Sequence, residues 1–309
     1  MEIKERQAML QFSLRFSRAL FSYRAQLWFF LLPFLIGTAV LIVMPMTATF
    51  FLGLTDYDLF SPPEWNDFQN YQNWLGDRLF QRALYNSVWF MLIAVPLRVA
   101  GALVLALFLN RSGRAFGFAR ATVYLPTIVP EVAYALVWLL ILNPGFGAVN
   151  LLLDALHLPT VAWTLVPFTA RASIVVMWLF QLGEGFVLML AALQLIPHEL
   201  LEAAAIDGAN RVQRFRHIIL PFMVPALLLL TFRDIALSFQ GVFVAGILTT
   251  ETGPYYTTYF MPHYVVDEAF ALFRYGYASA TTSLIYLVTL LTVIGLFVLV
   301  GRRRDDGVE

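Results

Sequence analysis

Long apolar runs with few charges dominate this sequence, and they limit what it can fold into. A helix rises about 1.5 Å per residue, so a run of about eighteen residues or more can cross a bilayer core of about 30 Å. Six runs of this kind occur, at residues 27–44, 84–109, 121–142, 173–195, 220–248 and 277–300. The sequence therefore predicts an all-α membrane protein with six transmembrane helices.

Composition supports the membrane class and excludes several kinds of site. Hydrophobic residues make up 60% of the chain and charged residues only 13%, which lies outside the usual range of soluble domains. The chain has no cysteine, so it has no disulfide framework and no thiolate metal site, and its four histidines show no ligand spacing. We therefore expect no metal or other cofactor in this chain. A net charge of zero gives no reason to expect a nucleic acid partner either.

The distribution of lysine and arginine predicts which side of the membrane each connection faces. Basic residues gather in segment 1–26, in the connection around 110–120, in the loop 197–220 and in the tail 301–309. The opposite connections contain only Arg78, Arg82, Arg171 and Arg274. Both termini and the 197–220 loop are therefore predicted to be cytoplasmic. We expect 1–26 to be a basic interfacial segment that contacts lipid, 27–300 to be a six-span transmembrane domain, and 301–309 to be a basic tail.

The longer loops on the opposite side are rich in aromatic residues. We expect them to be packed structures and not loose linkers, although an aromatic belt at the membrane interface explains any single residue equally well.

One predicted cytoplasmic loop has a distinctive pattern. Residues 202–221 read EAAAIDGANRVQRFRHIILP, a polar and basic insert between two apolar runs. The insert opens with strong helix formers, breaks at Gly208, and resumes as a basic segment that ends at Pro221. This pattern predicts a helix, a turn and a second helix outside the bilayer.

These residues resemble the signature loop of the permease subunits of ATP-binding-cassette (ABC) importers. That loop reads E-A-A, three residues, G, nine residues, I-x-L-P, and Glu202, Gly208, Ile218 and Pro221 stand at matching positions. The approach LQLIPHELLEAAAIDGA is similar to the carbohydrate-importer branch of the family, and the resemblance covers almost the whole chain, as in YLPTIVPEVAYALVW from Tyr124. It implies a multi-pass permease of a bacterial or archaeal inner membrane that imports a sugar or sugar derivative.

The resemblance also implies partners and roles for the loop. A second homologous permease, two copies of an ABC ATPase and an extracytoplasmic solute-binding protein would complete the transporter, and the ATPase would bind ATP and magnesium. The loop would be the coupling helix that docks on the ATPase, where Glu202 would offer a carboxylate to a basic group and Gly208 would permit the turn. The residues implied in coupling are Glu202, Ala203, Ala204, Asp207, Gly208 and Ala209.

The source of energy separates the competing functions. The sequence has no G-x-x-x-x-G-K-S/T phosphate loop, so we expect a transport subunit without an ATPase site of its own, and not an enzyme. A separate ATPase is one energy source, and the 202–221 pattern favours it. The alternative is a gradient-driven secondary transporter that relays protons through Arg98, Glu131 and Asp234. An intramembrane enzyme ranks last, because the apolar runs contain no paired histidine or serine constellation.

Several charged residues lie inside the apolar runs, where each costs about 2.5–3.5 kcal/mol at mid-helix unless a partner or water compensates it. Arg98 lies in the second run, Glu131 in the third, and Arg233 and Asp234 are adjacent in the fifth. Adjacent helical residues point about 100° apart, so we expect Arg233 and Asp234 to have different neighbours. Arg98 has two candidate partners, Glu131 and Asp234.

The fourth run contains Trp178, Gln181 and Glu184 at intervals of three residues, which places them near one face of a helix. An aromatic ring can cover the apolar face of a sugar while carboxylate and amide groups bind its hydroxyls. Polar contacts between helices would explain the pattern equally well. The predicted substrate pathway comprises Trp178, Gln181, Glu184, Glu131, Arg98 and Asp234.

Overall fold

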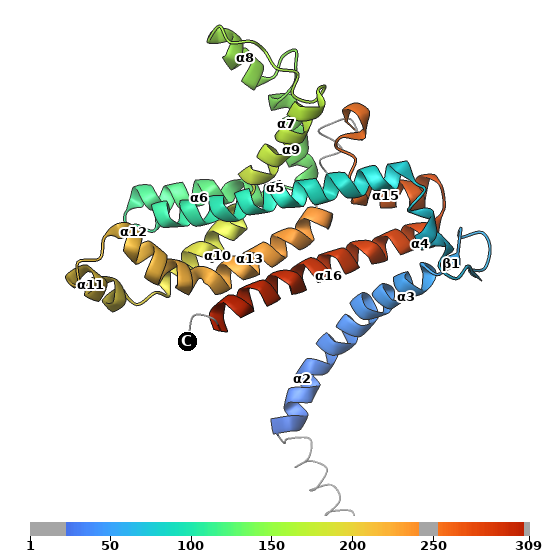
Figure 1. Cartoon of the computed structure of the whole chain (residues 1–309), viewed down its shortest axis with the longest axis horizontal. Helices are drawn as coiled ribbons and strands as arrows, with labels where there is room; N and C mark the ends of the chain where they lie inside the picture. The colour runs from blue at the N-terminus through green and yellow to red at the C-terminus, as the bar shows by residue number, and fades with distance from the viewer. Residues whose placement is uncertain (1–22, 241–252, 306–309) are drawn as a thin grey trace, which may run out of the picture.

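The described residues form a bundle of long helices with two short strands. The computed structural model describes residues 23–240 and 253–305, and most of these residues are helical. Figure 1 shows α5 (Arg78–Leu109), α13 (Leu220–Gln240) and α16 (Tyr275–Asp305) running side by side along the long axis of the bundle.

Within the described residues, four continuous helical segments are long and apolar enough to cross a membrane, namely Gln26–Leu52, Arg78–Leu109, Arg211–Gln240 and Tyr275–Val298. The first consists of α2 (Tyr23–Thr38), a π-helical turn (Ala39–Val43) and α3 (Met44–Leu52). The third consists of α12 (Arg211–Arg214), a π-helical turn (Phe215–Ile219) and α13. These segments match the first, second, fifth and sixth predicted spans. Most of the predicted interfacial segment 1–26, the end of the fifth span at 241–248 and the end of the basic tail at 306–309 lie outside the described residues.

The third predicted span, 121–142, is not one continuous helix but a bent pair, which counts as one span only if its two helices cross the membrane together. The region forms α6 (Arg114–Ile128) and α7 (Glu131–Ile141), and the chain direction bends by 103° between them. Pro130 lies at the break. It has no amide hydrogen for a helical bond, and its ring disfavours the helical conformation of Val129, which has φ −70° and ψ 130°.

The fourth predicted span, 173–195, is also bent. It forms α9 (Pro167–Phe180) and α10 (Gly183–Gln194), and the chain direction bends by 46° between them. Gly183 at the start of α10 lies so close to α6 that an added Cβ atom would be 2.9 Å from the backbone of Tyr124. The bend therefore places α10 directly against α6. If each bent pair is counted as one span, the part of the chain that the structure describes has up to six spans.

Helix α5 is the centre of the bundle and packs against α9, α10, α13 and α15 (Met261–Val266). Fully buried alanines at Ala94, Ala102 and Ala106 let the neighbouring helices approach it closely. Two clusters of buried apolar side chains surround α5. The one nearer its start includes Phe90, Trp178 and Tyr264, and the one nearer its end includes Phe186, Met189 and Met223.

Two parts of the chain stand away from the bundle in Figure 1, namely α2 and the unit of α7 and α8 (Ala148–Ala155). The apolar window of the first span buries none of its residues in this chain. The loop around α8 is closed by the buried side chain of Asn150. Its amide donates to the carbonyl oxygens of Pro144 and Val161, and its Oδ1 accepts from Val161 N and from Trp163 Nε1.

The connection before α5 is packed, as its aromatic content predicts. Strands β1 (Thr55–Asp56) and β2 (Glu64–Trp65) pair antiparallel, and Asn70 in α4 (Gln69–Asn73) donates to two backbone carbonyl oxygens at 3.0 and 2.9 Å. Trp74 stacks on Phe80 with ring centroids 5.1 Å apart. These contacts fix the connection to the first turn of α5.

Asp77 joins this connection to a later part of the chain. Its Oδ1 accepts hydrogen bonds from the amides of Leu79 and Phe80 at 2.8 and 3.0 Å, which caps α5. Its Oδ2 accepts a hydrogen bond from the hydroxyl of Tyr264 in α15 at 2.5 Å. Burial alone would raise the pKa of Asp77, but these hydrogen bonds outweigh it and hold the pKa of Asp77 below its usual value.

The pKa of Glu268 is shifted in the opposite direction, above its usual value. It lies buried in a π-helical turn (Asp267–Ala271), where Arg274 is its ion-pair partner at 2.6 Å. Burial raises the pKa of Glu268, although Arg274 opposes the shift. Folding therefore favours the neutral carboxyl, so the contribution of Glu268 to stability increases as the pH falls through its raised pKa.

We expect Asp77→Ala to destabilise the protein by about 1 kcal/mol at neutral pH, the usual cost of a lost helix cap. The pKa of Asp77 is lower in the folded protein, so its carboxylate stabilises the fold above a pH of about 4. That contribution is lost as the pH falls through the folded pKa, and the difference from wild type should then shrink. Thermal unfolding in detergent at several pH values measures the stability difference between wild type and Asp77→Ala. Asp56→Ala, at an exposed aspartate, is the control. A difference that stays constant into acid would contradict it.

Candidate functional site

The loop 197–220 folds as a helix, a turn and a second helix. Helix α11 (His198–Ile206) ends in a Schellman turn, in which the amide of Gly208 donates to Ala205 O at 3.1 Å and the amide of Ala209 donates to Ala204 O at 2.9 Å. Gly208 has a φ of +83°, a conformation that glycine adopts without steric cost. The position of the turn is therefore set by the glycine.

The second helix of the loop begins at a capping box. The side chain of Asn210 accepts from the amide of Gln213 at 2.9 Å, and Oε1 of Gln213 accepts from the amide of Asn210 at 2.8 Å. The two caps, one at the end of α11 and one at the start of α12, fix the angle between the helices.

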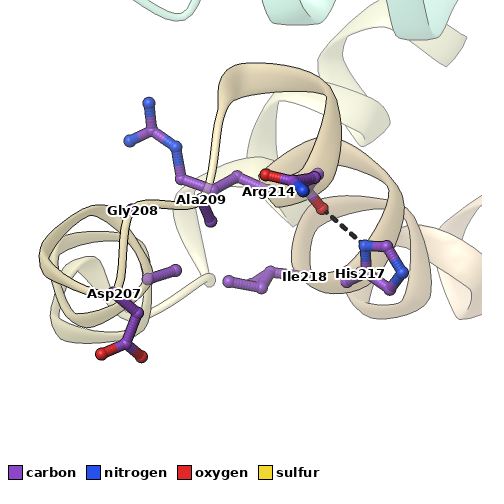
Figure 2. Close-up of a pocket in the computed structure, with 8 residues that line it drawn as sticks. Asp207, Gly208, Ala209, Arg214, His217 and Ile218 are labelled. Carbon is purple, nitrogen blue, oxygen red and sulfur yellow. Dashed lines mark hydrogen bonds between the residues drawn. The ribbon is translucent and has the colours of Figure 1, made fainter.

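A groove of about 320 Å³ lies between α11 and the second helix of the loop. Figure 2 shows Asp207 and Gly208 on one side of it and His217 and Ile218 on the other. Nδ1 of His217 lies 3.0 Å from the carbonyl oxygen of Gln213. The groove is lined by Ala204, Asp207, Gly208, Ala209, Gln213, Arg214, His217 and Ile218.

The outer surface of α11 is open to a partner. Glu202, Ala203 and Asp207 are exposed, and Ile206 is 87% exposed. Among the residues that the structure describes, no basic side chain forms an ion pair with Glu202 or Asp207. Figure 1 shows α11 projecting beyond the end of the bundle. The loop therefore presents small, acidic and apolar groups at a position that the rest of this chain does not cover.

A second cavity, of about 240 Å³, lies inside the bundle where the two bent spans meet. The break between α6 and α7 contributes Thr127, Val129, Glu131 and Tyr134, and the break between α9 and α10 contributes Met177, Trp178, Gln181 and Glu184. Arg98 of α5 and Arg233 and Leu237 of α13 complete the lining. All the residues of the predicted substrate pathway except Asp234 thus line one cavity, and Asp234 contacts Arg98 behind it.

Arg98, which lines this cavity, connects three helices. Its side chain is nearly fully buried, and its Nη2 donates to the carbonyl oxygen of Gln181 at 2.6 Å, at the carboxyl end of α9. Its Nε lies 3.6 Å from Oδ2 of Asp234, which is fully buried. Of the two partners that the sequence allowed for Arg98, the structure has Asp234 and not Glu131.

A second ion pair joins Arg233 to Glu184 at the mouth of the cavity, where both side chains are partly exposed. Arg233 also lies 3.6 Å from its neighbour Asp234. The main partners of Arg233 and Asp234 therefore differ, as their helical spacing predicts. Glu131 is exposed in the first turn of α7, and within the described residues it forms no ion pair.

The predicted single face of Trp178, Gln181 and Glu184 does not exist, because α9 ends at Phe180 and α10 begins at Gly183. The three residues still line one cavity. Trp178 is only 8% exposed, and the guanidinium of Arg98 lies 4.2 Å from the centroid of its ring. In this conformation Arg98 therefore occupies the ring face that a sugar would need.

Three polar residues that line the cavity, Thr127, Tyr134 and Arg233, were not part of the predicted substrate pathway. Tyr134 lies one helical turn after Glu131, and its hydroxyl donates to the carbonyl oxygen of Met177 at 2.8 Å. The signal available for Arg233 was its charge in an apolar run. In the part of the chain that the structure describes, no group of three histidine, aspartate or glutamate side chains is placed to hold a metal ion.

Comparison with protein families decides the class. Residues 98–306, more than half of the chain, match the family described as binding-protein-dependent transport system inner membrane component. The chain belongs to this family. It is therefore an inner membrane transport component, in agreement with its several helices of membrane-spanning length.

Relatives of this inner membrane component align with it over most of their lengths. The probable ABC transporter permease protein YesP of Bacillus subtilis is 34% identical, with 88% of this chain and 87% of the relative covered. The trehalose/maltose transport system permease protein MalF of Thermococcus litoralis is 32% identical, with 89% and 93% covered. These relatives give no support to the alternative of a gradient-driven carrier.

The fold of this transport component is also found in a solved structure. The structure is of a bacterial ABC transporter involved in the import of the acidic polysaccharide alginate. It has a TM-score of 0.77 and 24% sequence identity, with 94% of this chain and 99% of the other covered. At that identity the likeness shows the ABC permease fold alone.

Proposed function

We propose that this chain is the permease subunit of an ATP-driven importer of a sugar or sugar derivative, and that it forms half of the translocation pathway. The observation that carries the proposal is the 197–220 loop. In a member of this family, α11 projects from the bundle with an exposed carboxylate at Glu202 and turns sharply at Gly208.

In this proposal α11 is the coupling helix that docks on a separate ATPase. Glu202 pairs with a basic group of that subunit, and Ala203 is small enough to allow close approach. The groove beside Ala204 and Ala209 accepts a side chain of the ATPase in return. The remaining coupling residues are Asp207 and Gly208, of which Gly208 fixes the turn.

The subunit arrangement follows from the same proposal. Both termini and α11 face the cytoplasm, with 1–26 as an interfacial segment, 27–300 as the permease domain and 301–309 as a basic tail. A second homologous permease forms the other half of the pathway, two ATPase copies bind ATP and magnesium, and a solute-binding protein delivers substrate from outside. This chain itself carries no cofactor.

A carbohydrate substrate is supported by the polar cavity and by the named substrates of two relatives. MalF of Thermococcus litoralis is named for trehalose and maltose, and SmoG of Agrobacterium fabrum, 28% identical, for sulfoquinovosyl glycerol. In the cavity of this chain Glu131, Gln181 and Glu184 offer hydrogen-bond acceptors and an amide to hydroxyl groups. Arg98 and Asp234 hold the shape of the pathway behind them.

Purification of the tagged full-length chain from its own membrane in mild detergent tests the function. Mass spectrometry should find an ATPase and a second permease bound at near-stoichiometric levels, and the purified assembly should show uptake that depends on ATP. A chain that is isolated alone and still takes up solute along an ion gradient would overturn the proposal.

Glu184→Gln is expected to lower uptake by roughly tenfold or more if its carboxylate binds substrate, since a hydrogen bond to a charged group contributes about 1.5–3 kcal/mol. The folded yield should stay near normal, because Glu184 is partly exposed. Trp178→Ala should mainly lower the yield, because its ring is buried against Phe90 and Arg98. Transport rate per folded molecule separates the two effects. Unchanged uptake in Glu184→Gln would remove Glu184 from the pathway.

A further inference from the structure

Positively charged residues cluster at the short connection between α5 and α6. They line neither the cavity in the bundle nor the groove beside α11. Arg111 lies in the connection itself, Arg114 and Arg120 lie in the first two turns of α6, and no acidic residue occurs between 110 and 120. In the described part of the chain, none of these three arginines forms an ion pair with a carboxylate. Three guanidinium groups therefore lie close together in sequence without a counter-charge from this chain.

The connection is held in shape by its own side chains. Nη2 of Arg120 donates to the carbonyl oxygen of Arg111 at 3.0 Å, and its Nε donates to the carbonyl oxygen of Phe116 at 3.2 Å. The guanidinium of Arg111 lies 5.8 Å from the ring centroid of Phe108 and 5.7 Å from that of Phe116. Arg120 thus braces the backbone, while Arg111 and Arg114 remain exposed.

Exposed aromatic side chains flank the charges on both helices. Phe108, in the last turn of α5, and Phe118, in the second turn of α6, are 60% and 77% exposed. Phe108 lies on a helix of membrane-spanning length, and Phe118 lies on the first helix of a bent pair that together is long and apolar enough to cross a membrane. In an inner membrane protein, exposed rings on such helices can contact acyl chains, which would place the adjacent guanidinium groups near the depth of the lipid headgroups.

We propose that this connection, defined by Phe108, Arg111, Arg114, Phe118 and Arg120, is a binding site for an anionic phospholipid. The guanidinium groups of Arg111 and Arg114 bind the headgroup phosphate, and the two phenylalanine rings contact the acyl chains. A protein partner fits this surface less well. Figure 1 shows α11 extending beyond the α5–α6 turn, so a partner seated on α11 leaves that turn nearer the bilayer.

Native mass spectrometry of the purified full-length chain, with whatever subunits stay bound, tests the site. Phosphatidylglycerol and phosphatidylcholine are added in separate titrations. Wild-type protein should retain phosphatidylglycerol at low lipid concentration and phosphatidylcholine only at a much higher one. Since each arginine near an anionic headgroup contributes about 1 kcal/mol, Arg111→Gln with Arg114→Gln should weaken phosphatidylglycerol retention by roughly tenfold or more.

Two further variants make the test specific. Arg111→Lys with Arg114→Lys keeps the charges and should keep most of the retention. Arg211→Gln with Arg216→Gln removes two exposed arginines from the 197–220 loop and should leave retention unchanged. The measurement needs neither ATP nor substrate, so it can fail while the importer function holds.

Three outcomes would overturn the site. One is equal retention of phosphatidylglycerol by wild type and the Arg111/Arg114 glutamine variant. Another is an equal loss in the Arg211/Arg216 variant, which would mean that overall charge and not this connection attracts the lipid. The third is loss of a bound ATPase from the Arg111/Arg114 variant with lipid retention unchanged, which would assign the surface to a protein partner.

Discussion

Arg98→Met is expected to be the most damaging single substitution within the bundle, with a loss of about 3–5 kcal/mol in unfolding free energy, because it leaves the charge of Asp234 buried without its closest buried partner. Asp234 is fully buried, and among the described residues neither of its carboxylate oxygens accepts a hydrogen bond. Arg98 also holds the carbonyl oxygen of Gln181, so the same change frees the end of α9.

A double variant separates the charge from the packing. Arg98→Met with Asp234→Leu removes both buried charges, and it should recover much of the stability that Arg98→Met alone loses. Arg233→Met is the matched control. It removes an arginine at the same distance from Asp234, but one that is partly exposed, so water compensates the change and the loss should be smaller. Thermal unfolding followed by size-exclusion chromatography in detergent gives the ranking. Equal losses for Arg98→Met and Arg233→Met would contradict the role of the buried pair.

Gly208→Val is expected to abolish most transport, at least tenfold, while the protein still reaches the membrane at a near-normal level. The φ of +83° at Gly208 costs an ordinary L-residue about 1–2 kcal/mol, and a β-branched residue more, so the Schellman turn would reshape and α11 would change direction. Apart from the residue and its chain neighbours, no atom lies within 4 Å of the position of an added Cβ, so the cost of the added Cβ comes from the local backbone conformation and not from a neighbouring element. The effect of the substitution is therefore confined to the backbone.

Gly208→Asn is the matched control, because asparagine adopts the left-handed conformation more readily than other L-residues. It should keep much more uptake than Gly208→Val. Glu202→Ala, which leaves the backbone intact, should also lower uptake if the carboxylate contacts the ATPase. Uptake of labelled sugar, divided by the membrane level from immunoblotting, is the measurement. Wild-type uptake by Gly208→Val would show that the turn has no part in coupling.

The sequence predicted the membrane helices well, because each run can satisfy its own backbone hydrogen bonds and hydrophobicity alone marks it. The bend at Pro130 could also have been predicted from the sequence, because a proline and its effect on the preceding residue, Val129, are local. The bend after Phe180 was not, because it depends on how closely Gly183 packs against α6, and that contact joins residues distant in sequence.

The candidate sites were predictable to different degrees. The turn of the 197–220 loop is local, and Gly208 marks it. The partner of Arg98 was not predictable, because one sequence does not fix how helices are rotated against each other, and both Glu131 and Asp234 were available. Arg233 was noticed only as a neighbour of Asp234, although it is the residue that meets Glu184 at the cavity mouth.

The lack of burial along the first span has a consequence for how the chain is made. Since the apolar window of Gln26–Leu52 buries nothing in its own chain, its entry into the bilayer during synthesis depends on partitioning into lipid and not on residues that the ribosome has yet to add. The α6 segment differs, because its fifteen residues rise only about 22 Å and it packs against α10, which is synthesised later. The first span is therefore fit to insert alone, whereas α6 reaches its final position only after α10 has emerged.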